Sequence, residues 1–442
     1  MLEVRSSREM NKFVEVSKAF LLLMGKWLEF GERSRYAVLA IGMMSLSTTL
    51  SWYVICFNVA FIRITNLNDT LNYPENATLS LADQLTLFWV VAWLMRSLGT
   101  YKTQLICGIT TSIFTALTPF VIAYLPFWAL FLSRFIQGIP LCNLYPVVGA
   151  IVNQWSCANE KGMFISVLTG YLQISAMLGM ALGGILSEFV SWPAVFYVHS
   201  GTKSISVLPL GYLLQVPYCE IFQTKSVIAI YVAVLGNFVA FNFVNTFFAQ
   251  YLHKMFGIKT LEAGLITAAV LLGQFVVKFV TGVVCDRLVG ITELSKIRWC
   301  NSIAFLGTAT LFVVYLSIPI TWPVPSIIFL ALPYIILGVN AGGFPKSAVL
   351  ISGQHTQTIL AFLQVFLCGS FLIGSVLVPA MTPSSTYLEF TNVFRLYVVL
   401  LILTNGFFVA FSRATPEKWA RPAVPEKADL NQNEKQTLAQ EA

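Results

Sequence analysis

Charged residues are scarce in this chain. They make up 11% of its 442 residues, whereas an ordinary soluble domain has about 25%. Hydrophobic residues account for 57% of the sequence and aromatic residues for 14%, so the apolar surface exceeds what one water-soluble core can bury. The composition therefore excludes a soluble globular protein and indicates that lipid is the solvent for much of the chain.

Several sequence signals are also missing. The eight cysteines stand singly, without the spacing of a metal site or a disulfide framework, so we expect no metal and no other cofactor. The three histidines lie on different predicted elements, and no HExxH motif or nucleophile elbow is present, so we do not expect an enzyme. Basic residues form no patch with interleaved aromatics, which excludes nucleic acid as a partner. The N-terminus lacks the apolar core and cleavage site of a removable signal peptide.

Long apolar runs dominate the sequence instead. A helix needs about 20 apolar residues to cross a bilayer, and the runs predict an all-α integral membrane protein with about 12 spans. The spans are expected at residues 36–61, 83–100, 104–125, 127–150, 163–186, 192–216, 226–250, 262–284, 299–320, 325–346, 359–381 and 391–412. The second and sixth spans are short or interrupted by polar residues, which leaves a ten-span arrangement as an alternative.

The loop charges predict the orientation. Lys and Arg fall mainly in the tails and in the loops of one side, whereas only Arg63, Lys254 and Lys259 fall in loops of the other side. By the positive-inside rule both termini are cytosolic. The long outer loop carries two N-glycosylation sequons, at Asn68 and Asn76, which agrees with this orientation.

The expected organisation has five parts. They are a cytosolic N-terminal segment with an interfacial helix (1–35), six spans (36–216), a short central cytosolic loop (217–225), six further spans (226–412) and a cytosolic tail (413–442). The tail is polar and charged, so we expect it to be disordered.

Arg134 is the most informative residue within a span. It lies several residues inside the membrane, where a charge costs several kcal/mol unless it faces water, a partner or a substrate. Gln137, Asn143 and Tyr145 follow within the next three turns and favour a route-facing cluster. The alternative is an arginine that reaches the outer surface or a backbone carbonyl.

The other charges within spans are also basic, at Lys203, Lys278 and Lys346. The carboxylates lie at span ends, at Asp83, Glu188, Glu262, Asp286 and Glu389. A central cavity would thus be net positive and would favour anions. Lys278 and Lys346 lie near inner ends, so each either lines the route or reaches the surface. His199 either packs or titrates, and it is the remaining candidate for proton coupling.

A short motif ends the eighth span. It reads Gly282-Val-Val-Cys-Asp286-Arg287-Leu288. The glycine lets two helices approach closely, and the Asp286 and Arg287 side chains can form a charge relay with a neighbouring helix end. Such a relay breaks when two halves rock, so the motif predicts a conformational switch.

These motifs together resemble the anion transporter family of the major facilitator superfamily, which includes sialin, the vesicular glutamate transporters and the sodium-phosphate cotransporters. The strongest stretch runs from Arg134 to Gly201 and contains RFIQG, LYP, Trp155 and the VFYV run that begins at Val195; the run at 342–347 is similar to invertebrate members. The resemblance implies two six-helix bundles around a central site and alternating access. It also implies a monomer in the plasma membrane or in a lysosomal or vesicular membrane. The cargo would be a small organic anion or phosphate, with a proton or sodium as co-ion.

The resemblance also bears on single residues. Arg134 matches the family's fourth-span arginine, which implies a substrate-binding role, and Asn58 and Lys346 are further candidates to line the route. Apolar or neutral residues replace the family's charged ones at three positions, Cys56, Leu141 and Leu350. Two functions therefore stay open: a secondary active or facilitative anion transporter, and a transport-inactive member that acts as a regulator or partner.

Overall fold

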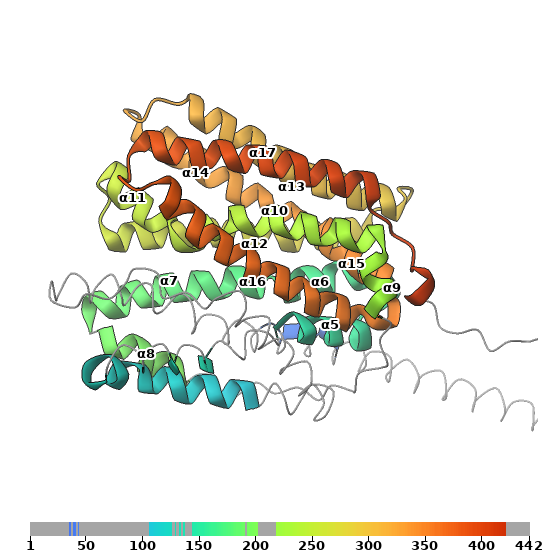
Figure 1. Cartoon of the computed structure of the whole chain (residues 1–442), viewed down its shortest axis with the longest axis horizontal. Coiled ribbons are helices and arrows are strands. Elements are labelled where there is room, and N and C mark those ends of the chain that lie inside the picture. The colour runs from blue at the N-terminus through green and yellow to red at the C-terminus, as the bar shows by residue number, and fades with distance from the viewer. Residues whose placement is uncertain are drawn as a thin grey trace, which may run out of the picture.

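The computed structural model of this chain describes part of its residues. The described ranges are 35–36, 39–40, 43, 106–125, 129, 132–133, 136–137, 144–190, 192–201 and 218–420. Within these ranges every regular element is a helix, and most helices run side by side (Figure 1). The first two predicted spans lie outside the described ranges, apart from a few residues of the first.

The helices before residue 217 form the first group. They are Ile106–Tyr124, α5 (Leu144–Trp155), η3 (Ala158–Glu160), α6 (Lys161–Thr169), α7 (Tyr171–Phe189) and α8 (Trp192–Gly201). α6 and α7 follow one another directly, because the Gly170 between them keeps a right-handed helical conformation and its backbone N–H bonds to Ser166 and Val167 carbonyls. Together α6 and α7 replace the single span predicted at 163–186.

The helices after residue 217 form the second group, which lies above the first in Figure 1. They are α9 (Tyr218–Gln223), α10 (Lys225–Thr246), α11 (Phe248–Phe256), α12 (Thr260–Arg287), α13 (Glu293–Ser317), α14 (Pro323–Ile336), η5 (Leu337–Gly342), α15 (Phe344–Ser352), η6 (Gly353–His355), α16 (Thr356–Met381), α17 (Tyr387–Phe411) and η7 (Lys418–Ala420). The segment 217–225, predicted as a loop, thus contains the short helix α9.

Seven helices or continuous helical stretches among the described residues are long and apolar enough to cross a membrane. Their outward faces remain apolar: on α12, Leu265, Leu272, Val276 and Phe279 are all exposed and recur at helical spacing. Such a face suits contact with lipid, and the backbone polar groups of each helix are satisfied internally. The chain is a multi-pass integral membrane protein.

The tenth predicted span is broken into three pieces. α14 passes into the 3-10 segment η5, and α15 resumes after Gly343. Sequence explains the break, because Gly342 and Gly343 are weak helix formers and the Pro345 that follows has no backbone N–H to continue the hydrogen-bond ladder. A 3-10 stretch inside a long helix is typical of a hinge or a ligand site.

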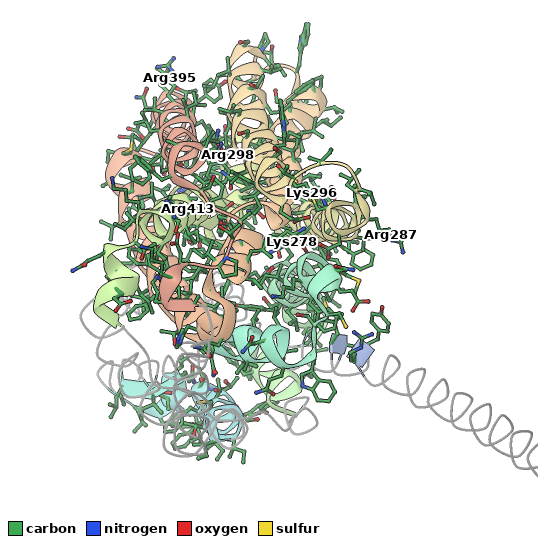
Figure 2. The ribbon with its side chains drawn as sticks, turned by 90° about the vertical axis from the view of Figure 1, so that its right-hand side faces the viewer. Lys278, Arg287, Lys296, Arg298, Arg395 and Arg413 are labelled. Atoms are coloured by element: carbon green, nitrogen blue, oxygen red, sulfur yellow. The ribbon has the colours of Figure 1, made fainter. Side chains whose placement is uncertain are left out.

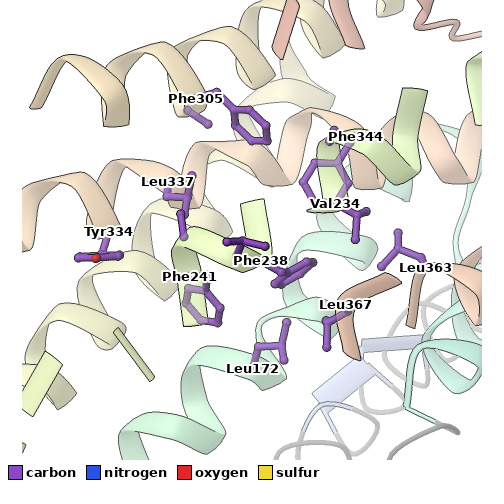
Figure 3. Close-up of a cluster of buried hydrophobic side chains, with 14 of the residues drawn as sticks. Leu172, Val234, Phe238, Phe241, Phe305, Tyr334, Leu337, Phe344, Leu363 and Leu367 are labelled. Atoms are coloured by element: carbon purple, nitrogen blue, oxygen red, sulfur yellow. The ribbon is translucent and has the colours of Figure 1, made fainter. Parts of the chain in front are cut away.

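Aromatic rings pack the interior of the second group. The Phe243 ring lies 5.1 Å from the Phe394 ring and stacks on Tyr334 at 6.4 Å, while the Tyr251 and Tyr315 hydroxyls lie 2.6 Å apart. Figure 3 shows a neighbouring part of the core, where rings of α10, α14 and α15 meet leucines of α7 and α16. Helices in a membrane associate mainly by such packing, since lipid is as apolar as the side chains.

The structure differs from the expected disorder of 413–442 over its first eight residues, 413–420. The Glu417 side chain is buried and accepts a hydrogen bond from Ser226 Oγ at 2.7 Å, and the Glu417 backbone N–H donates to the Ile351 carbonyl at 3.1 Å. A buried, hydrogen-bonded carboxylate holds a segment that composition alone would leave in water. This part of the tail therefore packs against the ends of α10 and α15.

Candidate functional site at the junction of the two helix groups

The two groups meet where α6 and the start of α7 run antiparallel to α12. Contacts pair Gly162 with Asp286, Ser166 with Gly282, Gly170 with Phe275 and Gln173 with Gln274. These pairs run from the end of α12 at Arg287 to its middle, since Gln274 lies near the centre of Thr260–Arg287. We call this contact the α6–α12 junction and the side of the molecule at Arg287 the Arg287 end.

Small residues allow the close approach. A Cβ added at Gly170 would lie 2.5 Å from the Phe275 ring, and one at Gly282 would lie 2.6 Å from Ser166 Cβ. Both distances are far shorter than the 3.5–4.0 Å of ordinary carbon contacts. Glycine is therefore required at these positions by contact rather than by backbone conformation.

One carboxylate, Asp286, closes the junction at the Arg287 end, and ion pairs within the second group hold it. Asp286 accepts a hydrogen bond from the Met163 backbone N–H at 2.7 Å and forms an ion pair with Lys346 Nζ at 2.8 Å. Lys346 also pairs with Glu293 at 3.0 Å, and Glu293 pairs with Lys296 at 2.7 Å. The Asp286 carboxylate thus reaches the first turn of α6, where a negative charge is favoured by the unpaired N–H groups of the helix.

The structure places the other predicted residues as follows. Lys346 is 3% exposed and is held in the ion pairs above. Tyr145 is buried on α5, and its ring lies 5.9 Å from the Tyr171 ring. Arg287 is exposed. Figure 2 shows Arg287 at the rim of the helix assembly. His199 lies in α8, although its side chain is not among the described ones. The remaining predicted residues, Arg134, Asn58, Asn68 and Asn76, lie outside the described residues.

Lys278 is the residue whose environment sequence reasoning missed. It is 4% exposed, and its Nζ donates to the Thr169 carbonyl across the junction at 3.1 Å. No described carboxylate lies within ion-pair distance of it. Arg287 lies nine residues beyond Lys278, about 13 Å along the helix. That distance is longer than a lysine side chain, so the spacing argued against a Lys278 that reaches the surface at the helix end.

A buried ammonium group of this kind is costly. Removing one charge from water costs several kcal/mol, and a single carbonyl dipole offsets only part of that cost. Lys296 and Lys346 differ, because each is paired with at least one carboxylate. Among the described spans, Lys278 is therefore the buried lysine that no described carboxylate compensates. It lies between the middle of α12 and the Arg287 end, a position that Figure 2 shows inside the helix assembly.

Polar side chains surround the same level of the bundle. Gln173 Nε2 donates to Gln274 Oε1 at 3.3 Å, and Asn340 Nδ2 in η5 donates to Asn237 Oδ1 at 2.5 Å. Gly338 of η5 packs directly on the α12 backbone, since an added Cβ would lie 2.5 Å from the Gln274 carbonyl oxygen. The same Cβ would lie 3.2 Å from the Lys278 backbone nitrogen, so the broken tenth span adjoins α12 at Gln274 and Lys278. Among the described residues no group of His, Cys, Asp and Glu is placed to hold a metal ion.

A second contact joins the groups where α5 meets the start of α16. An added Cβ at Gly149 would lie 2.7 Å from the Gln357 Cα and 3.2 Å from the Thr356 carbonyl oxygen. Backbone thus packs on backbone here, with no flexible side chain between. Like the α6–α12 junction, this contact depends on a glycine.

Comparisons with known proteins agree with this architecture. A family model described as the Major Facilitator Superfamily matches residues 77–219. Similar proteins are an uncharacterized transporter of Caenorhabditis elegans, 22% identical over 73% of this chain and 67% of its own length, and human sialin, 22% identical over 70% of this chain and 69% of its own. Vesicular glutamate transporter 3 of Danio rerio is 21% identical over 65% of this chain and 55% of its own.

A solved structure shows the same fold. It is a bacterial homologue of the human lysosomal transporter Spinster, in an inward-facing and occupied conformation. The two chains match with a TM-score of 0.57 and 15% sequence identity, and the match covers 88% of this chain and 99% of the bacterial chain. Three of these four proteins are named as transporters or as a homologue of one, which agrees with the expectation of a transporter rather than an enzyme. The chain has the major facilitator superfamily fold and is similar to sialin and the vesicular glutamate transporters, which are members of the anion transporter family that its motifs resemble.

Proposed function

We propose that this protein carries small anions across a membrane by alternating access. One observation supports the choice of anions most directly. Among the described spans the fully buried charged side chains are Lys278, Lys296 and Lys346, and carboxylates compensate only the last two. An interior with net positive charge attracts anions and repels cations.

The relatives narrow the cargo. One of them is named for glutamate, which makes carboxylate-type solutes the first candidates, with phosphate as the second. Arg134 is the proposed main counter-charge, because its guanidinium can hold a carboxylate or a phosphate with two parallel hydrogen bonds. Tyr145, Asn58 and Lys346 are proposed to line the route; Lys346 would have to leave its ion pairs to do so.

The junction supports an alternating mechanism. Residues 36–216 and 226–412 are proposed to form two bundles, and between the described parts of these bundles the Arg287 end is closed by Asp286 and by helix packing at glycines. Opening that end breaks the hydrogen bonds from Met163 to Asp286 and from Lys278 to Thr169 and separates small residues. The ion pair of Asp286 with Lys346 stays within one bundle. Such a contact suits repeated opening and closing.

Location is proposed from the same relatives. With both termini cytosolic, the Arg287 end faces the cytosol. One relative is named a vesicular transporter, and the bacterial protein of the solved structure is a homologue of a lysosomal transporter. We therefore favour a vesicular or lysosomal membrane over the plasma membrane, and tagged protein imaged beside organelle markers tests this choice.

Uptake by reconstituted protein tests the function. The full chain is placed in liposomes and given labelled glutamate, other small carboxylates, phosphate and a cationic solute in turn. We expect uptake of at least one anion and none of the cation. Arg134→Ala should abolish that uptake, whereas the same substitution at the exposed Arg395 of α17 should leave it unchanged. Folded protein that takes up none of the anions would favour the transport-inactive alternative.

A further inference from the structure

We propose that Lys278 is a second anion-binding residue, which takes the carboxylate or phosphate group of the solute when the α6–α12 junction opens. The inference rests on the proposed transport function and adds to it a residue, a position and a conformational state. It starts from a difference between Lys278 and the other two buried lysines of the described spans.

Lys278 is bonded across the junction, and the other two are not. Its Nζ donates to the Thr169 carbonyl at the end of α6, in the first helix group. Lys346 and Lys296 are paired with Asp286 and Glu293, which belong to the second group like the lysines themselves. When the groups separate, Lys346 and Lys296 keep their partners. Lys278 alone loses its described partner.

The loss creates a site for an anion. An open junction leaves an ammonium group on α12 without the carbonyl that partly compensated it, facing the space from which α6 has withdrawn. Gln274 lies one helical turn away on the same face, where its side chain contacts Gln173 in the closed junction. An ammonium group and an amide offer donors to a carboxylate or phosphate oxygen, and they offer a cation no charged ligand.

The position assigns a step in transport to this site. Lys278 lies between the middle of α12 and the Arg287 end, so an anion that moves from the centre toward that end passes it. Binding there favours the open junction, because only the open state frees the ammonium group. Lys278 therefore acts on passage through the Arg287 end and is distinct from Arg134, which is proposed to bind the solute at the centre.

Substitutions that separate charge from hydrogen bonding test the assignment. Lys278→Gln keeps a donor for the Thr169 carbonyl but removes the charge, Lys278→Arg keeps the charge, and Lys278→Met removes both charge and donor. Lys296→Gln is the matched control, since Lys296 is equally buried but paired with Glu293 within one group. Each full-length variant is reconstituted and tested with the anion that the wild type transports best, and thermal unfolding reports whether it is folded.

Two readouts are expected to agree. Lys278→Gln and Lys278→Met should lower anion exchange about tenfold or more, the loss expected for a charge-assisted bond, while Lys278→Arg and Lys296→Gln stay within about threefold of wild type. Spin labels at Asn159→Cys and Val289→Cys, which are exposed at the Arg287 end on opposite sides of the junction, report its opening. Saturating anion should lengthen the distance between the labels in the wild type and not in Lys278→Gln.

The outcomes separate this inference from the function on which it rests. If the wild type transports an anion and the folded Lys278→Gln and Lys278→Met variants match it in exchange and in the distance change, Lys278 is a packing residue and the inference is wrong. Loss in Lys278→Met alone assigns Lys278 to holding the closed junction and also overturns anion binding. If the wild type transports none of the anions, the proposed function fails, and the inference fails with it.

Discussion

Replacing Gly149 by alanine should shift this protein away from the closed state of the Arg287 end. The added Cβ would lie 2.7 Å from the Gln357 Cα, whereas carbon atoms in contact lie about 3.5–4.0 Å apart. Because the obstructing atom belongs to the backbone, no side-chain rotation removes the clash. α5 and α16 must therefore separate by roughly 1 Å to accommodate it.

The size of the shift follows from the cost of overpacking. Inserting one carbon into a well-packed contact costs about 1–3 kcal/mol, and that cost applies only while α5 and α16 touch. The higher helix propensity of alanine stabilises open and closed states alike and does not affect their ratio. The open state should therefore gain about 5- to 140-fold in population relative to the closed one.

Distances between the spin labels at Asn159→Cys and Val289→Cys measure this ratio in nanodiscs without solute. Gly149→Ala should move the distribution toward longer distances. The matched control is Gly406→Ala on α17, where an added Cβ meets no atom within 4 Å, and it should leave the distribution unchanged. If folded Gly149→Ala gives the wild-type distribution, the contact between α5 and α16 does not limit opening, and the reasoning is refuted.

Three further results are expected. Asp286→Asn weakens the ion pair with Lys346 and the hydrogen bond to the α6 backbone, whereas Lys346 keeps its ion pair with Glu293. The free energy of unfolding should therefore fall by about 1–3 kcal/mol. Thermal unfolding in nanodiscs measures this change, and an unchanged transition contradicts the prediction. Glu417→Ala should expose the tail, so that trypsin cleaves it faster than in wild type while the membrane-embedded part stays intact. Asn68→Gln and Asn76→Gln together should abolish the glycosidase-sensitive gel shift, and a shift that persists would contradict the predicted outer loop.

Sequence predicted the spans of the second group well, because a membrane helix must satisfy its backbone internally and present an apolar surface, and both demands are visible in local composition. The eighth span was expected at 262–284 and is Thr260–Arg287. Composition misjudged residues 413–420, since their order depends on one buried carboxylate, Glu417, and its distant partner Ser226. Polar composition could not reveal a contact between segments so far apart in the sequence.

The candidate site was predictable to a lesser degree. The Gly282 motif pointed to a close helix contact, because glycine followed by an acidic residue at a span end has a local meaning. Two contacts depend on how α6 and α12 align, namely Asp286 with the start of α6 and Lys278 with Thr169. Alignment of helices is a property of the packed bundle, and no spacing within one stretch encodes it.

The distribution of contact types indicates where this molecule moves. Among the described residues, each aromatic ring pair joins residues of the same helix group, as Phe312 with Phe394 and Tyr145 with Tyr171 do. Interlocked rings resist sliding, because every displacement loses many close contacts at once. Between the described parts of the two groups, the close contacts are glycines on side chains or on backbone and a few hydrogen bonds. Water can replace those hydrogen bonds when the surfaces part. If the protein alternates as proposed, we therefore expect the second group to move as a unit and to separate from the first along the α6–α12 junction and the contact of α5 with α16.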